Sequence, residues 1–330
     1  MNDFWQSKHV LVTGAGGFIG NALAAALVQR GADVTAFVRY TSRADSGLLR
    51  FLPDDVRSQL TVISGDLRDA DAVERAAADK DLIFHLGALI SIPYSYHHPV
   101  EVVETNVIGT LNVLQASRKV GCRLVHTSTS EVYGTALTVP IDEQHPLQGQ
   151  SPYSASKIGA DKLVESYWRA FDVQAVTVRP FNTYGPGQSA RAVIPTIITQ
   201  ALTSDVIHLG NIDAKRDFTY VTDTVDGFLK AAEAEGVAGE TFNLGYGAEI
   251  TIGDLAQEII ALTGFSHCIT VDEERLRPEK SEVMRLLSDN RKARERLGWS
   301  PQVDIRTGLQ HTISWIRTHL DLYRPGKYEL

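Results

Sequence analysis

Short runs of β-branched and other apolar residues alternate with longer amphipathic segments through the first 180 residues of the chain. The short runs predict strands, and the segments whose apolar residues recur three or four positions apart predict helices. The predicted strands cover residues 9–13, 34–38, 60–63, 81–85, 123–127 and 175–179. The predicted helices cover residues 18–30, 100–120 and 152–170. This alternation indicates an α/β fold with a doubly wound sheet of parallel strands joined by right-handed crossovers.

The pattern changes after residue 180. Loops rich in Gly, Pro and Asn replace the regular alternation, and further helices are predicted near residues 252–263 and 307–319. We therefore expect residues 1–180 to form the sheet domain and residues 181–330 to form a smaller C-terminal α/β lobe that binds the substrate. The chain can cross between the two more than once.

Composition narrows the classes of partner and compartment. The chain has 330 residues, 43% of them hydrophobic, and can bury a full core. A formal charge of -8 without a basic cluster argues against nucleic acid as a partner. Because no apolar stretch approaches the roughly 18 residues of a membrane span, and the first ten residues lack the apolar run of a signal peptide, we expect no membrane association.

The cysteines and histidines predict neither disulfides nor a metal. Cys122 and Cys268 cannot form a disulfide framework, which favours a reducing, cytoplasmic location. No pair of histidines has a ligand spacing supported by acidic partners, so we expect no metal site at His85, His97, His98 or His126.

Residues 13–20 read Thr-Gly-Ala-Gly-Gly-Phe-Ile-Gly and join the first predicted strand to the first predicted helix. Glycines at 14, 17 and 20 let the chain turn tightly, let backbone amides approach a pyrophosphate and let the helix pack close to the strand. The helix N-terminus then faces the anion. In this position the pattern predicts a Rossmann-like dinucleotide site formed by Gly14, Gly16, Gly17, Phe18, Ile19 and Gly20.

The ends of the next strands bear on the choice of NAD or NADP. An NAD site usually has an acidic residue after its second strand, whereas this chain has Arg39, followed by Ser42 and Arg43. These side chains favour a 2'-phosphate and hence NADP, although solvated arginines beside an NAD site are an open alternative. Asp66 is placed either to accept from the adenine amino group or to cap a helix. The predicted cofactor site also includes Leu67 and Leu86.

Tyr153 and Lys157 lie four residues apart on a predicted helix and therefore share one face. An ammonium beside a phenol favours the phenolate, so we expect a lowered pKa for Tyr153 and a role as acid and base for its hydroxyl. Both residues also count toward the predicted cofactor site.

The segment after the fifth predicted strand, 129–131, reads Thr-Ser-Glu and supplies the other predicted catalytic residues, Thr129, Ser130 and Glu131. Thr129 can hydrogen-bond the substrate oxygen that Tyr153 deprotonates. Glu131 is a second base, which suggests chemistry at a neighbouring carbon, unless it only caps a turn or pairs with a surface cation.

The glycine motif with Thr129, Tyr153 and Lys157 resembles the extended short-chain dehydrogenase/reductase family over nearly the whole chain. Asn106 in 105–110, Arg-Pro-Phe-Asn at 179–182 and Arg-Asp-Phe at 216–218 resemble members that modify nucleotide sugars. The resemblance implies four residues of the substrate site: Asn106, which shapes the active site, Asn182 and Arg216, which contact the diphosphate, and Arg277, which contacts the ribose or phosphate. Because members commonly dimerise through the helices at 100–120 and 152–170, it also implies a homodimer.

Segments 127–136, 151–161 and 179–198 look most like the N-acetylglucosamine-nucleotide 4,6-dehydratases of legionaminic acid synthesis, which are NAD(P)-dependent lyases. The resemblance implies that NAD(P) takes hydride from carbon 4 of the sugar while Tyr153 accepts the hydroxyl proton. Glu131 then removes the proton on carbon 5, the hydroxyl on carbon 6 leaves as water, and the hydride returns to carbon 6.

Ser130 departs from the usual dehydratase pattern, which places Asp there to protonate the leaving hydroxyl. Glu131 itself, a water or another residue then has to supply that proton. Thr-Ser-Glu also resembles the UDP-glucuronate decarboxylases, and nucleotide-sugar 4-epimerases are a third alternative, although they usually have a small residue at the position of Glu131. A dinucleotide-binding sensor without turnover is the alternative outside enzymes.

Overall fold

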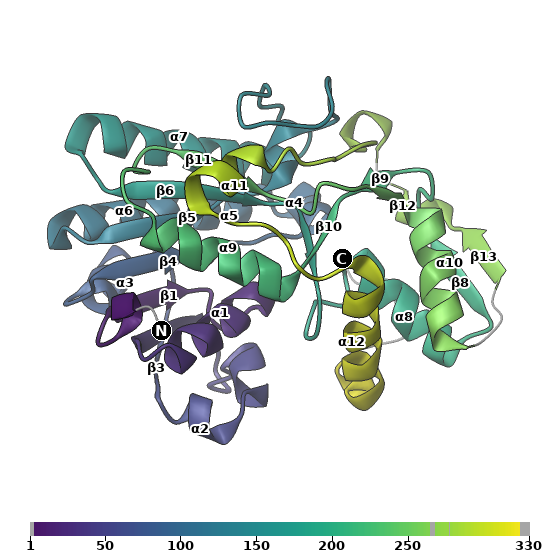
Figure 1. The fold of residues 1–330 in the computed structure, drawn as a ribbon, viewed down its shortest axis with the longest axis horizontal. Coiled ribbons are helices and arrows are strands. Elements are labelled where there is room, and N and C mark those ends of the chain that lie inside the picture. The colour runs from purple at the N-terminus through teal and green to yellow at the C-terminus, as the bar shows by residue number, and fades with distance from the viewer. Residues whose placement is uncertain (1–2, 265–267, 277, 324–330) are drawn as a thin grey trace.

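The computed structural model describes residues 3–264, 268–276 and 278–323. Its central sheet has seven strands in the order β11–β6–β5–β4–β1–β2–β3, and every strand pairs in parallel with its neighbours (Figure 1). The strands are β1 (His9–Thr13), β2 (Asp33–Arg39), β3 (Leu60–Gly65), β4 (Leu82–His85), β5 (Arg123–Thr127), β6 (Ala175–Pro180) and β11 (Thr241–Leu244).

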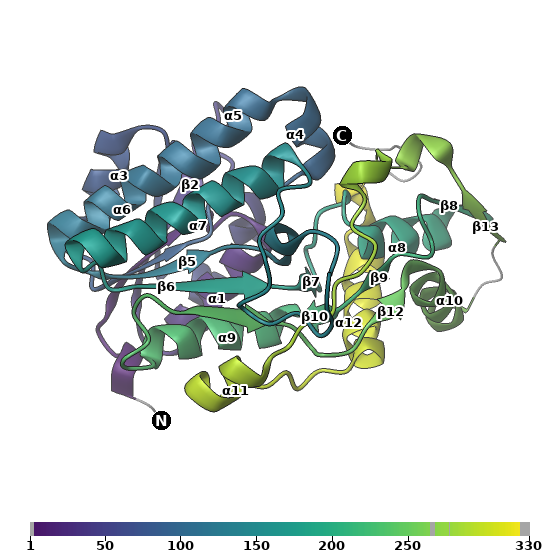
Figure 2. The ribbon, with the colours of Figure 1, turned by 90° about the horizontal axis from the view of Figure 1, so that it is seen from above.

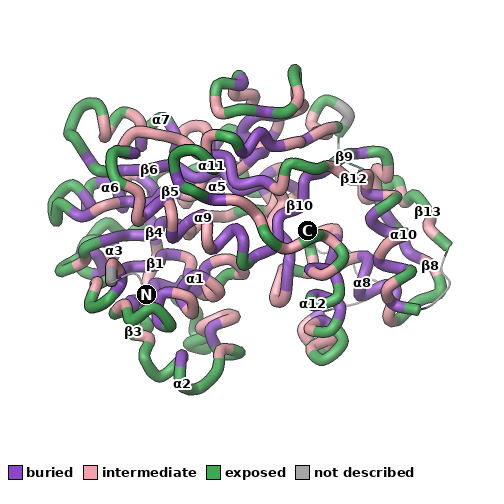
Figure 3. Tube along the Cα trace, viewed as in Figure 1, coloured by how far each residue is buried: buried purple, intermediate pink, exposed green. Residues whose placement is uncertain are grey.

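Helices cover both faces of this sheet (Figure 2). One face carries α3 (Ala70–Ala77), α5 (Pro99–Val103), α6 (Gly109–Val120) and α7 (Pro152–Phe171), and the other carries α1 (Phe18–Gln29), α9 (Val221–Glu233) and α11 (Arg291–Leu297). Because both faces are covered, the central strands are largely buried, and all six residues of β6 are buried (Figure 3). The predicted α/β fold with a doubly wound parallel sheet is confirmed.

The second half of the chain returns to the sheet before it completes the lobe. After the short strands β7 (Asn182–Tyr184) and β10 (Phe218–Tyr220), which pair in parallel, helix α9 packs against α1 and β11 pairs with β6. The local pattern did not predict β11 as a strand of the central sheet, because only its pairing with β6 places this short segment there.

The remaining elements build the smaller lobe beside the carboxyl edge of the sheet (Figure 1). Its helices are α8 (Val193–Thr203), α10 (Ile252–Thr263) and α12 (Ile305–Thr318). Strands β8 (Val206–Leu209) and β13 (Cys268–Val271) pair in parallel, and β9 (Lys215–Arg216) pairs antiparallel with β12 (Ile250–Thr251). The short helices α2 (Asp54–Arg57) and α4 (Ile92–His97) lie in loops after β2 and β4.

Local signals explain where the two long helical segments begin and end. Helix α7 starts with a capping box between Ser151 and Ser154, with Pro152 in its first turn. Helix α6 ends at Gly121, whose φ of 77° is the left-handed conformation that glycine adopts readily. The single helix predicted over 100–120 is instead interrupted by a π-helical turn over Glu104–Ile108. Within the described residues, no helix is both long enough and apolar enough to cross a membrane.

Candidate active site

The loop between β1 and α1 lies at the carboxyl edge of the sheet, where ligands bind in this architecture. Gly14 has a φ of +72°, and a Cβ built there would lie 2.8 Å from Gly87. A Cβ on Gly20 would lie 2.2 Å from the carbonyl oxygen of Gly14, so α1 approaches the loop too closely for any side chain. No side chain caps the first turn of α1, whose N-cap is Gly17. The uncapped first turn of the helix and the close backbone approach fit a pyrophosphate.

The other residues of the predicted cofactor site surround this loop. The carbonyl oxygen of Gly16 accepts a hydrogen bond from the Leu48 amide at 2.9 Å, which ties the loop to the segment after β2. Leu67 is buried between β3 and α3 and packs in the core. Three partly buried side chains also pack against the core: Phe18, Ile19 and Leu86.

The charged side chains at the ends of β2 and β3 have protein partners. Arg39 donates to Glu101 at 3.1 Å. Asp66 accepts from the Arg68 guanidinium at 3.0 and 2.7 Å, and these bonds lower the pKa of Asp66. Asp69, which accepts from the Ala72 amide, caps α3, so the alternative role of Asp66 as the helix cap is wrong. Ser42 and Arg43 are exposed in the loop after β2.

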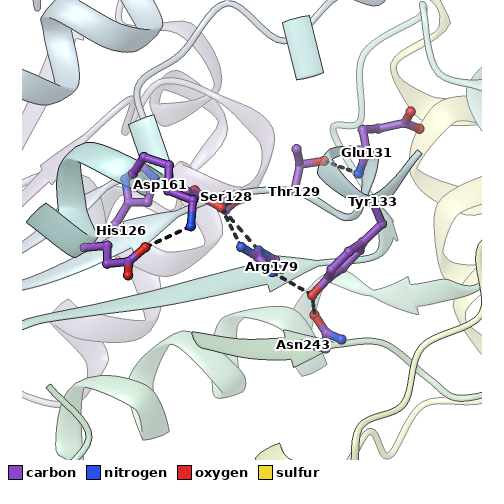
Figure 4. Close-up of polar contacts among 10 residues, drawn as sticks. His126, Ser128, Thr129, Glu131, Tyr133, Asp161, Arg179 and Asn243 are labelled. Atoms are coloured by element: carbon purple, nitrogen blue, oxygen red, sulfur yellow. Dashed lines mark hydrogen bonds and ion pairs between the residues drawn. The ribbon is translucent and has the colours of Figure 1, made fainter. Parts of the chain in front are cut away.

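Thr129 and Glu131 lie in a tight turn directly after β5. Thr129 caps a 3-10 helix, Ser130–Tyr133, by accepting from the Glu131 amide at 3.2 Å. The Glu131 side chain is half-buried and points away from the polar network on the other side of the turn (Figure 4). Ser130 is 3% exposed, and its hydroxyl is no replacement for the carboxylic acid of the usual dehydratase pattern.

Tyr153 and Lys157 lie one turn apart on α7 and are both buried. Tyr153 forms a hydrogen bond with Thr129 and interacts electrostatically with the carboxylate of Glu131. The structure therefore brings together the two predicted catalytic segments, the turn after β5 and the start of α7. The expected lowering of the Tyr153 pKa is wrong for this structure: burial raises that pKa, and only the hydrogen bond with Thr129 opposes the rise. Burial lowers the pKa of Lys157 to about 8.

Asn106 lies in the π-helical turn between α5 and α6 and is 1% exposed. Its side-chain oxygen accepts from the Leu89 amide at 2.8 Å. Its side-chain nitrogen donates to the Leu89 carbonyl and to Ser156, each at 2.9 Å. Both amide hydrogens are therefore used within the protein. Asn106 joins the loop after β4 to α7, which suits a role in shaping the site better than a direct contact with a substrate.

The two residues expected at the diphosphate, and the third expected at the ribose or phosphate of the nucleotide, lie in different situations. Asn182 begins β7, and its buried side-chain oxygen has no hydrogen-bond partner in the described part of the chain. Arg216 is 7% exposed on β9 and pairs with Glu282 at 3.4 Å. Arg277 lies outside the described residues.

A buried polar network behind the catalytic turn was missed by the sequence reasoning. It joins residues of α7, β5, β6, β11 and the 3-10 helix: His126, Ser128, Tyr133, Asp161, Arg179 and Asn243 (Figure 4). The spacing of four from Lys157 to Asp161 was the one local signal that could have indicated it. His126 belongs to this network, and His85 hydrogen-bonds Thr13 and Thr110, so both strand histidines have protein partners.

A cavity of about 370 Å³ lies beside α7, and its lining includes Glu143, His145, Trp168 and Arg179. None of the predicted catalytic residues lines it. The cavity is therefore distinct from the cluster of Thr129, Tyr153 and Lys157.

Comparison with known proteins identifies the family to which this arrangement belongs. Residues 11–312 match the model of the GDP-mannose 4,6 dehydratase family. The chain belongs to this family. The resemblance to extended short-chain dehydrogenases/reductases that modify nucleotide sugars is thereby confirmed.

Proteins similar to this member of the GDP-mannose 4,6 dehydratase family have names that denote different reactions. The chain is 33% identical to a UDP-glucose 4-epimerase of Mycolicibacterium smegmatis, with 93% of this chain and 98% of that protein covered. It is 30% identical to UDP-glucuronic acid decarboxylase 1 of Xenopus tropicalis, with 97% and 75% covered. The structure of DesIV, a dTDP-glucose 4,6-dehydratase from Streptomyces venezuelae with NAD bound, superimposes with a TM-score of 0.86 at 31% identity, with 97% and 100% covered.

Proposed function

We propose that this protein is a nucleotide-sugar 4,6-dehydratase that converts a nucleoside-diphosphate hexose, with N-acetylglucosamine as the expected sugar, to its 4-keto-6-deoxy form. The observation that carries the proposal is the position of Glu131, a carboxylate two residues beyond Thr129 and close enough to act electrostatically on Tyr153. Besides a hydride acceptor, oxidation at one carbon needs only one base, the tyrosine. A second carboxylate beside it supports removal of a proton from the neighbouring carbon.

A nicotinamide dinucleotide held by the glycine loop would supply a hydride acceptor for carbon 4 and a hydride donor for carbon 6. Tyr153 takes the proton of the hydroxyl on carbon 4, with Thr129 hydrogen-bonded to its oxygen. Lys157 supplies a positive charge one turn along α7, which favours the phenolate. The resulting ketone acidifies the hydrogen on carbon 5, which Glu131 removes.

The leaving hydroxyl on carbon 6 needs a proton that Ser130 cannot supply. We infer that Glu131 passes on the proton it took from carbon 5, so that the hydroxyl leaves as water. The proton held by Tyr153 is then the one that returns to the sugar when carbon 6 receives the hydride. Two protons leave the sugar, one ends in water and one returns, and the net change is the loss of one water.

Two further proposals concern the same site. NADP is the expected cofactor, because Arg39 ends β2 and Arg43 lies in the loop after it, where a carboxylate would repel a 2'-phosphate. Arg216 and Asn182 are the expected diphosphate contacts, and a bound diphosphate would compete with Glu282 for Arg216. A homodimer and a cytoplasmic location complete the proposal.

The deciding experiment is incubation of the purified protein with a panel of UDP-, GDP- and dTDP-sugars followed by mass spectrometry. A product lighter by about 18 Da is one water lost and supports the dehydratase, whereas a loss of about 44 Da from UDP-glucuronate is carbon dioxide and contradicts it. A product of unchanged mass and altered stereochemistry indicates an epimerase. The matched control is Tyr153→Phe, which should bind NADP as the wild type does and lose turnover. Equal turnover in that variant would contradict the assigned role of Tyr153.

A further inference from the structure

Asp161 is a buried carboxylate that no step of the proposed reaction uses. Tyr153, Lys157 and Asp161 are spaced by four residues along α7, and each is less than one-tenth exposed. Residues spaced by four are neighbours on a helix surface, so the Asp161 carboxylate lies one turn beyond the Lys157 ammonium. The three side chains therefore form one buried row of a phenol, a cation and an anion.

Four hydrogen bonds from the neighbouring strands fix this carboxylate in place. Its Oδ1 accepts from Nε2 of His126 on β5 at 3.2 Å. Its Oδ2 accepts from the Ser128 hydroxyl, which follows β5, at 2.8 Å. The same oxygen accepts from Nε and Nη2 of Arg179 on β6 at 3.3 and 2.9 Å (Figure 4). A carboxylate with this many donors remains charged although it is buried.

Arg179 extends the network to the catalytic turn. Its Nη1 donates to the Tyr133 hydroxyl at 2.8 Å, and that hydroxyl donates to Asn243 of β11 at 2.7 Å. Tyr133 ends the 3-10 helix that carries Glu131, and Ser128 directly precedes Thr129. Asp161 thus connects the helix that carries Tyr153 to both ends of the turn that carries Thr129.

Lys157 is buried and lacks the partners that Asp161 has. Lys157 is only 4% exposed. Within the described ranges, no hydrogen bond or ion pair joins its ammonium to another side chain. A buried ammonium without a nearby anion loses its proton readily. Asp161 is the charged group that opposes this loss.

We propose that Asp161 is a positioning residue whose fixed carboxylate keeps the Lys157 ammonium protonated at the pH of turnover. The inference rests on the proposed function in so far as a charged Lys157 serves the reaction of Tyr153. It adds a residue to the site that neither the glycine motif nor the tyrosine and lysine pair contains.

The charges around Lys157 are consistent with this role. The titratable groups that interact electrostatically with it are His85 from β4, His126 from β5 and Asp161 from α7. Tyr153 lies one turn before it on the same helix. Burial lowers the pKa of both histidines, so they are neutral at pH 7. Burial also lowers the pKa of Lys157 to about 8, and Asp161 opposes that change. Removal of the anion should therefore lower the pKa of Lys157 further.

The test compares Asp161→Asn with Asp223→Asn, which removes a second buried carboxylate. Asp223 is 5% exposed on α9 and accepts from the Val303 amide at 2.9 Å, away from the catalytic row. NMR titration of protein labelled at the lysine Cε, with Lys157→Met to assign the signal, reads the pKa of Lys157 without substrate or cofactor. We expect a value near 8 for wild type and Asp223→Asn. Asp161→Asn should lower it by roughly one unit or more.

Turnover supplies the second measurement. A pKa that falls from about 8 to about 7 reduces the charged fraction of Lys157 at pH 8 from about one-half to about one-tenth. Asp161→Asn should therefore lower kcat about fivefold at pH 8 and change it less than about twofold at pH 6, with KM unchanged. An unchanged titration of Lys157 in this variant overturns the proposal. Because the titration needs no substrate, failure of the nucleotide-sugar assay leaves this result independent.

Asp161→Asn leaves the buried Arg179 without its counter-ion and can destabilise the fold. The double variant Asp161→Asn with Arg179→Met removes both charges of that pair and should fold more stably than the single variant. We expect Lys157 to keep its lowered pKa there, because its anion is still missing. If the double variant restores the titration near 8, Asp161 acts only through Arg179 and the proposal is wrong.

Discussion

Substitution of Gly20 tests whether the glycine loop holds the dinucleotide. An Ala at this position puts a methyl carbon 2.2 Å from the Gly14 carbonyl oxygen and 2.9 Å from the Ala15 Cα. Because Cβ contacts essentially never fall below 3.0 Å, the loop and the start of α1 must separate by about 0.8 Å, the difference between 3.0 and 2.2 Å. The amides expected to face the pyrophosphate should move with them.

Overpacking of this kind costs about 1–3 kcal/mol. If binding has to restore the native loop, the Kd for NADP rises roughly 5- to 150-fold, since about 1.4 kcal/mol corresponds to a factor of ten. Isothermal titration calorimetry measures the Kd, and thermal unfolding measures the accompanying loss of stability.

The matched control is Gly253→Ala in the first turn of α10, where the nearest atom to a new Cβ is 3.5 Å away. This is an ordinary contact, and Ala favours a helix by up to about 1 kcal/mol over Gly. The control should bind NADP as the wild type does. A Kd for Gly20→Ala within twofold of the control would refute the assignment of the glycine loop as the dinucleotide site.

Four further changes test other parts of the site and the assembly. The Glu131→Gln variant should still oxidise carbon 4 but release no water. Reduced cofactor should therefore accumulate in a single turnover, which its absorbance measures. Water release at the wild-type rate would contradict the role of Glu131. Arg39→Glu should raise the Kd ratio of NADP to NAD by about tenfold, measured by calorimetry, because a carboxylate repels the 2'-phosphate; an unchanged ratio places the phosphate elsewhere. Val103, on α5, is 44% exposed, and Val103→Glu should convert the proposed dimer to a monomer in light scattering. The control Val271→Glu, at a residue 49% exposed on β13, should leave the dimer unchanged. Burial would raise the pKa of Asp161, but His126 and Arg179 outweigh it and lower this pKa to about 2. The stabilising contribution of Asp161 is therefore present above about pH 4 and is lost as pH falls toward 2. Asp161→Asn should flatten this part of the pH dependence of thermal unfolding.

Several features of the protein follow from local sequence alone. The six strands and the helices α1, α6 and α7 of the first 180 residues follow from hydrophobic periodicity, because strands buried on both faces are rich in apolar residues. The shorter helices α2, α3 and α4 were not predicted. The glycine loop follows from its position between a strand and a helix. Tyr153 and Lys157 share a face because the helix period puts residues spaced by four together.

Other features depend on contacts between segments far apart in the chain. Strand β11 belongs to the central sheet only because it pairs with β6. Arg39 pairs with Glu101 and Arg216 pairs with Glu282, and neither pairing has a local signal. Asn106 forms hydrogen bonds to Leu89 and Ser156 because the π-helical turn that carries it packs against α7.

The electrostatics of the site were decided by the tertiary structure. Spacing alone predicted a lowered pKa for Tyr153, but burial, which no local pattern measures, raises it. The same burial makes the charge of Lys157 depend on Asp161, whose carboxylate is held by β5 and β6. Sequence patterns determine which side chains share a face of one helix or strand. The dielectric environment and the counter-charges come from whichever other segments pack around that face, and only the folded chain specifies them.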